Sequence, residues 1–99
     1  MKEDTQETVG ETARRRLTIC NQKGLHARAA AKFVKLAGQF DAEVTVVKNE
    51  SAVSGSSIMG LMMLAAAKGC ELELRAVGPD ASKALAALSR LVFDRFDED

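Results

Sequence analysis

The chain has 99 residues, and its 14 Lys and Arg side chains balance 14 Asp and Glu side chains. This length fits one domain with a single core, which can fold without a disulfide framework or a structural metal. The balanced charge argues against nucleic-acid binding and against attraction to an anionic membrane, because both depend on a strong basic field. The two cysteines, Cys20 and Cys70, form no CxxC pair and have no neighbouring histidine, so we expect no metal site and no cofactor.

The first residues of the chain do not show the pattern expected of a secretory signal. Residues 1–12 are polar and acidic, without the apolar centre of a signal peptide. The longest apolar stretch, residues 58–67, is too short to cross a bilayer. We therefore expect a cytoplasmic protein with a flexible polar extension over residues 1–12 and a single folded domain over residues 13–99.

The first half of the domain predicts three strands and one helix. Alternating apolar and polar residues over 14–21 predict a half-buried strand. Apolar residues at helical spacing predict a helix over 26–37, which Gly38 ends. Residues 42–48 are rich in β-branched side chains, and with the short run 52–54 they predict a hairpin of two strands.

The second half predicts two helices around one strand. Ser57 is a suitable N-cap for a short apolar helix over residues 58–67. Alternation over residues 70–77 predicts a strand with one wet face, and Asp80 is the expected cap of a final amphipathic helix. The resulting order, βαββαβα, predicts an α+β open-faced sandwich, in which three helices cover one face of a four-stranded antiparallel sheet.

One short segment combines residues suited to phosphoryl chemistry. His26 is the only histidine and stands where a glycine-containing loop meets the start of the first predicted helix. The first amides of a helix lack intrahelical partners and, with the helix dipole, favour an anion such as phosphate. Arg28 can bring its guanidinium group to phosphoryl oxygens. Spacing alone equally allows an ordinary helix cap at His26 and an ordinary surface cation at Arg28.

A wider match decides between these two interpretations. The segments GLHARAAAKF and SSIMGLMMLAAAKG occur in this order. Together they resemble the histidine-containing phosphocarrier proteins, HPr and its nitrogen-branch relatives (NPr), of the bacterial phosphotransferase system. The resemblance runs from about Leu17 to Phe96 and includes the predicted βαββαβα order.

The resemblance implies a phosphocarrier and not a stand-alone enzyme. By it, His26 accepts a phosphoryl group on Nδ1 from enzyme I, which uses phosphoenolpyruvate, and passes it to a IIA protein. Arg28 matches the family's partnering arginine. Many members carry a proline where this chain has Ala29, so we expect a modest change in partner preference or phosphate geometry.

The second motif predicts a docking surface. Its helix is apolar around nearly its whole circumference, and a small domain cannot bury all of it. We assign Leu61 and Leu64 to the core. The predicted docking patch consists of Ala27, Lys35, Ile58, Met59 and Met62. Flexible Met side chains suit a surface that must fit a donor and then a different acceptor.

Ser57 matches the family position that an ATP-dependent HPr kinase/phosphorylase modifies in some bacteria. The alternative is that Ser57 is simply the N-cap of its helix.

Two further alternatives remain open at this level. FDAEV and the terminal FDED look closer to the nitrogen branch, which has a regulatory role, but a general sugar-branch HPr uses the same histidine chemistry. A different class, an α+β interaction module without phosphoryl transfer, lacks the basic stripe and aromatic variety of RNA-binding modules. A monomer is the default for a relay protein.

Overall fold

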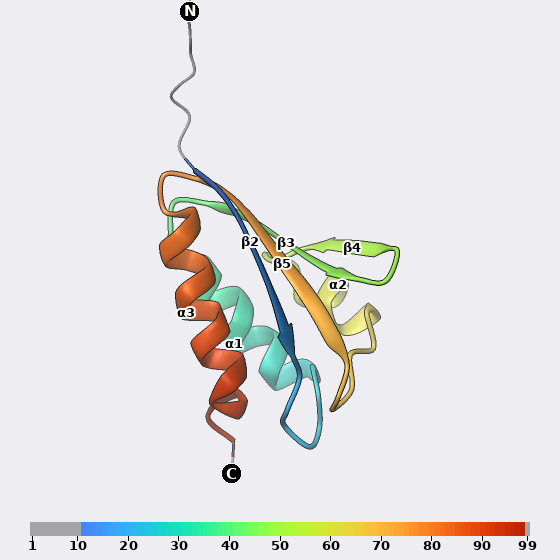
Figure 1. Cartoon of the computed structure of the whole chain (residues 1–99). Helices are drawn as coiled ribbons and strands as arrows, with labels where there is room; N and C mark the ends of the chain where they lie inside the picture. Colours follow the sequence, from blue (N-terminus) through green and yellow to red (C-terminus); the bar gives the residue numbers. More distant parts are fainter. Residues whose placement is uncertain (1–10, 99) are drawn as a thin grey trace, which may run out of the picture.

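The computed structural model describes residues 11–98, and its elements follow the predicted order βαββαβα (Figure 1). The strands are β2 (Glu11–Thr18), β3 (Glu43–Lys48), β4 (Ser51–Ser54) and β5 (Glu71–Gly78). The helices are α1 (Ala27–Ala37), α2 (Ile58–Met63) and α3 (Ala81–Phe93), followed by a short 3-10 turn, η2 (Arg95–Asp97).

All neighbouring strands of the sheet are antiparallel, in the order β2-β5-β3-β4. The helices cover one face, with α1 and α3 side by side (Figure 1), and this confirms the open-faced sandwich. The core lies between the sheet and the helices, because alternate strand residues and one stripe of each helix face the same space. Its largest fully buried side chains are Phe33, Phe96, Ile19, Leu61, Leu74, Leu85 and Leu88.

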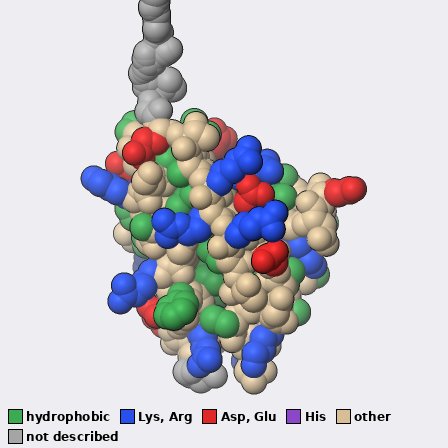
Figure 2. Space-filling model, viewed as in Figure 1, with side chains coloured by type: hydrophobic (Ala, Val, Ile, Leu, Met, Phe, Trp, Pro, Cys, Tyr) green, Lys and Arg blue, Asp and Glu red, His purple; other side chains and the backbone are tan. Residues whose placement is uncertain are grey.

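The opposite face of the sheet is charged and open to solvent, as predicted. Figure 2 shows Lys and Arg side chains next to Asp and Glu side chains on this surface. Glu73 Oε2 lies 3.2 Å from Nε of Arg75 and 3.8 Å from Nε of Arg14. The hydrogen bond from Arg75 lowers the pKa of Glu73, with partial desolvation opposing and the nearby arginine charges reinforcing the effect. Such exposed pairs add little stability, so this face mainly keeps the sheet hydrated.

The first strand begins earlier than predicted. Glu11 and Thr12, expected in the N-terminal extension, belong to β2 and pair with Gly78 and Val77 of β5. Backbone pairing along a sheet needs no apolar side chains at an exposed end, so composition alone placed this boundary too late. The rest of the predicted extension, residues 1–10, lies outside the described residues.

Helix α2 ends at Met63, four residues earlier than predicted. Ala65 has φ 54°, which stops the helix, and its carbonyl accepts a hydrogen bond from Lys48 Nζ at 3.2 Å. The next carbonyl, of Ala66, accepts from the amide of Leu25 at 2.9 Å. These partners from distant segments replace the intrahelical hydrogen bonds that the helix-forming residues would otherwise make.

The cap of α3 also differs from the prediction. Asp80 precedes the helix but makes no side-chain cap; its carboxylate accepts from the amide of Asp41 at 2.9 Å. Glu11 Oε1 instead accepts from the amide of Ser82 at 2.9 Å. A carboxylate from β2 therefore satisfies an amide in the first turn of α3. Within residues 11–98, no helix is long and apolar enough to span a membrane.

Candidate functional site

His26 is the residue directly before α1. Its backbone is extended and its carbonyl accepts the first hydrogen bond of the helix, from the amide of Ala30 at 2.8 Å. The three amides that precede Ala30 in the helix have no acceptor one turn earlier, so they can serve an anion beside the imidazole. The structure thus places His26 at the helix end where the sequence predicts it.

The loop before His26 has a shape that requires glycine. Gly24 has φ +64°, and a Cβ there would lie only 2.4 Å from the carbonyl oxygen of Ala66. Its own carbonyl accepts from Nδ2 of the fully buried Asn21 at 2.9 Å. This close approach joins the histidine loop to the segment after α2, so both motifs meet in one region.

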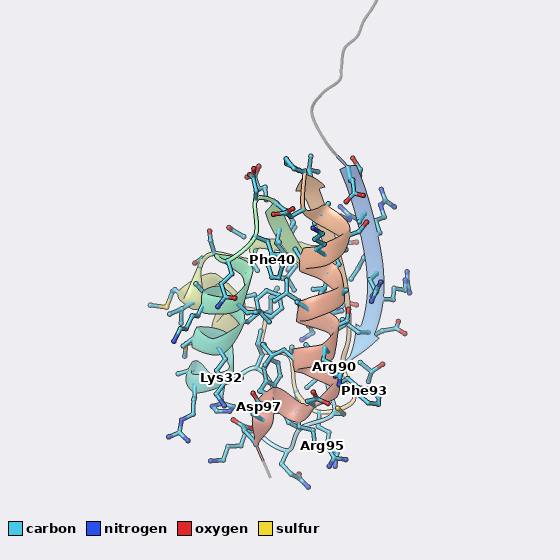
Figure 3. The ribbon with its side chains drawn as sticks, turned by 90° about the vertical axis from the view of Figure 1, so that its left-hand side faces the viewer. Lys32, Phe40, Arg90, Phe93, Arg95 and Asp97 are labelled. Atoms are coloured by element: carbon cyan, nitrogen blue, oxygen red, sulfur yellow. The ribbon has the colours of Figure 1, made fainter. Side chains whose placement is uncertain are left out.

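The end of the chain folds back over this loop as a C-terminal strap, residues 94–98. Three successive residues, Arg95, Phe96 and Asp97, have left-handed φ angles between 55° and 62°. Phe96 is fully buried, and its carbonyl accepts from Lys32 Nζ of α1 at 2.6 Å. Figure 3 shows Lys32 and Asp97 at the same end of the molecule. The buried ring and this hydrogen bond hold a backbone shape that non-glycine residues rarely adopt.

The strap brings Glu98 against the histidine. Its Oε2 lies 2.5 Å from Nε2 of His26, and its Oε1 accepts from Asn21 Nδ2 at 3.1 Å. Partial desolvation raises the pKa of Glu98, but hydrogen bonds from His26 and Asn21 and the charge of Lys32 hold it below the usual value. The carboxylate is therefore ionised at neutral pH and acts only as an acceptor.

Beside this pair lies an open hollow of about 360 Å³. It is lined by Gln22, Lys23, Arg28, Lys32, Asp97 and Glu98. Three cationic side chains and two carboxylates therefore share this hollow near the start of α1, and the cations are the groups that can attract a phosphoryl group. The part of the chain that the structure describes contains no cluster of three or more His, Cys, Asp or Glu suited to a metal ion.

Comparison with known proteins identifies the family of the chain. The family model for the PTS HPr component phosphorylation site matches residues 13–94. The chain belongs to the HPr family of phosphocarrier proteins. Members of this family work in the phosphotransferase system with partners such as enzyme I and IIA proteins, and are carriers and not stand-alone catalysts.

The relatives extend over nearly the whole HPr domain. A phosphocarrier protein HPr of Neisseria meningitidis serogroup A is 54% identical over 82 residues, 83% of this chain and 92% of that protein. A phosphocarrier protein NPr of Shewanella violacea is 49% identical over 84 residues, 85% of this chain and 92% of that protein. A crystal structure of HPr from Thermoanaerobacter tengcongensis superposes with a TM-score of 0.84 at 38% identity, covering 88% of this chain and 98% of that one.

Part of the apolar surface of α2 is exposed, as expected for a helix that is apolar around nearly its whole circumference in a small domain. Leu61 and Leu64 are buried, whereas Ile58, Met59 and Met62 are exposed. Ala27 and Lys35 on α1 are exposed as well, and α1 packs against α2. Among residues 11–98 the most exposed methionine is Met63, at 78%, and sequence reasoning did not assign it to the patch. Exposure is the condition for docking, and the docking role itself stays a prediction.

Sequence reasoning missed four members of the site: Asn21, Lys23, Lys32 and Glu98. Glu98 is 72 positions from His26, and no local periodicity connects them. From the sequence, the terminal FDED segment indicated only the nitrogen branch and no contact with His26. Contacts of this kind become visible only when α3 has been packed against α1.

Proposed function

We propose that this HPr-family protein accepts a phosphoryl group from phosphorylated enzyme I on His26 in the cytoplasm. It then passes the group to a IIA protein of a regulatory, nitrogen-type branch. The observation that carries this proposal is the position of the imidazole beside the N-terminus of α1 and next to the hollow rimmed by Lys23, Arg28 and Lys32.

Each of these groups has a separate role in phosphoryl transfer. The imidazole supplies the nucleophile, and the first amides of α1 receive the phosphoryl oxygens. Arg28 is exposed and two residues from His26, so its guanidinium can move onto the transferring group and neutralise charge there. A phosphoryl group on nitrogen keeps a high transfer potential, which allows it to be passed on.

The test uses the whole chain, active enzyme I, phosphoenolpyruvate and magnesium, with intact-mass spectrometry as the readout. We expect one acid-labile phosphoryl group on the wild-type chain and none on His26→Ala. Arg28→Ala should still accept the group, but about tenfold more slowly, the usual scale for losing a charged hydrogen bond. An unmodified wild-type chain would contradict the proposal and favour a non-catalytic interaction module.

We propose that the patch of Ala27, Lys35, Ile58, Met59 and Met62 docks both donor and acceptor. An apolar centre beside the histidine with a cationic rim aligns the partners for a short encounter. Met59→Glu should raise the Michaelis constant toward enzyme I without unfolding the domain, because Met59 is 69% exposed. Val77→Glu, on the open face of the sheet, is the matched control and should leave transfer unchanged.

The nitrogen branch is proposed on the FDAEV and FDED segments and on the NPr relative. The second candidate is a general sugar-branch carrier, since HPr relatives match at 54% identity. To distinguish the two candidates, the phosphorylated protein is given equal amounts of a nitrogen-type and a sugar-type IIA protein, and the rate of transfer to each is measured. Faster transfer to the nitrogen-type acceptor supports the proposal, and equal or reversed rates contradict it.

Ser57 is proposed as a regulatory site for an HPr kinase/phosphorylase. It is half-buried, and its Oγ accepts from the amide of Gly60 at 2.9 Å, so it is also the predicted N-cap of α2. A phosphate on Ser57 would place negative charge beside the docking patch. Incubation of Ser57→Ala and wild-type chains with this kinase and ATP tests the site, and equal labelling of both would contradict it.

A further inference from the structure

The strongest contact at the histidine comes from the end of the chain. Glu98 engages Nε2 of His26 and is itself held by Asn21. The strap that carries Glu98 is anchored by the buried ring of Phe96 and by the hydrogen bond from Lys32. Four separate contacts therefore fix one carboxylate at one nitrogen of the imidazole.

The chemistry of this contact determines which nitrogen can react. An ionised carboxylate has no proton to donate, so Nε2 must carry the proton of the hydrogen bond. In a neutral imidazole the lone pair then lies on Nδ1. A carboxylate that fixes the tautomer and the orientation of a histidine plays the same part in hydrolase triads and in second shells around metals.

We propose that Glu98 is the positioning residue of the phosphoryl acceptor. It holds His26 as the Nε2–H tautomer, aims Nδ1 at the incoming phosphorus and stabilises the positive charge that the ring gains on phosphorylation. The inference rests on the proposed function of His26 and adds a residue that lies outside both sequence motifs.

The transfer step balances with this assignment. The lone pair of Nδ1 forms the bond to phosphorus while the bond between phosphorus and the donor breaks, and its electron pair stays on the donor. The Nε2 proton remains in place, so the ring becomes cationic and faces the Glu98 carboxylate. Transfer to the acceptor returns the electron pair to Nδ1 and removes that charge. Glu98 therefore interacts more strongly with the phosphorylated ring than with the free one.

Four chains test the inference: wild type, Glu98→Gln, Glu98→Ala and the control Asp94→Asn. Asp94 begins the strap, is exposed, pairs with Arg90 of α3 and does not line the hollow beside His26. Two measurements are made on each. The first is the ¹H–¹⁵N NMR spectrum of the His26 ring, where a proton held on Nε2 is protected from exchange with water. The second is the rate of phosphorylation by enzyme I at varied concentration of the chain.

In wild type and Asp94→Asn we expect a protected Nε2 proton and equal rates, because the exposed pair of Asp94 with Arg90 lies outside the hollow. Glu98→Ala should lose the protected proton and lower kcat about tenfold with the Michaelis constant unchanged, because the docking patch is untouched. Glu98→Gln keeps an acceptor oxygen without the charge, so it should retain the protected proton. Its kcat should lie between those of the wild type and Glu98→Ala.

An unchanged proton or an unchanged kcat in Glu98→Ala would overturn the inference, as would an equal loss in Asp94→Asn. Failure of the wild-type chain to accept any phosphoryl group would overturn the proposed function. The two failures are distinguishable, because the first compares variants with an active wild type.

Discussion

Replacing Phe96 by alanine tests whether the C-terminal strap is part of the core. Phe96 is 0% exposed, and truncation of a fully buried Phe costs about 3–5 kcal/mol. If the strap then detaches, the relief of its left-handed backbone is opposed by the loss of the hydrogen bond from Lys32 and of the strap's other contacts. The net loss in the free energy of unfolding should therefore stay at about 3–5 kcal/mol.

The assay is urea unfolding followed by far-UV circular dichroism, with thermal unfolding as a second readout. For a domain of this size we expect the melting temperature to fall by about 12–40 °C, at about 4–8 °C for each kcal/mol. The control is Phe93→Ala, because Phe93 is 77% exposed on the outside of α3, next to Arg90 in Figure 3. It should change stability by less than about 0.5 kcal/mol.

A loss below about 1 kcal/mol in Phe96→Ala would refute this reasoning, since a ring that packs in the core cannot be removed at so small a cost. Equal losses in the two Phe variants would refute it as well. The same Phe96→Ala chain should lose the protected Nε2 proton of His26, because the strap no longer delivers Glu98.

Three further predictions concern the same region. Gly24→Ala should lower the free energy of unfolding, measured in urea, by about 2 kcal/mol or more. Gly69→Ala should lower it by only about 1 kcal/mol, because Gly69 has φ +90° but nothing lies within 4 Å of the added Cβ. Equal losses would show that the clash of the Gly24 Cβ with Ala66 is relieved. Asn21→Ala should destabilise the fold by about 1–3 kcal/mol through lost buried hydrogen bonds, and an unchanged urea midpoint would contradict this. The pKa of Glu98 is lowered in the folded chain, so its stabilising effect is present above the usual carboxyl pKa and is lost as the pH falls through the lowered pKa. The protection of the strap amides against exchange, taken relative to the intrinsic exchange rate at each pH, should therefore fall over this acidic range, and constant protection would count against the contact.

The sequence by itself determined the features that depend on neighbours along the chain. Apolar periodicity fixed the order βαββαβα, and the position of His26 followed from the loop and helix on either side of it. The N-cap at Ser57 and the burial of Leu61 and Leu64 depend equally on local spacing. Each of these features involves residues within about one helical turn or one strand of each other, so a linear pattern contains the information.

Tertiary structure alone decided the features that join distant segments. The early end of α2 depends on Lys48 and Leu25, and the cap of α3 is supplied by Glu11 from the first strand. Above all, the contact of Glu98 with His26 spans 72 positions and requires the packing of the strap on α1. Carboxylates and lysines have no periodic signature that marks a distant partner, and only the folded chain brings their charges together.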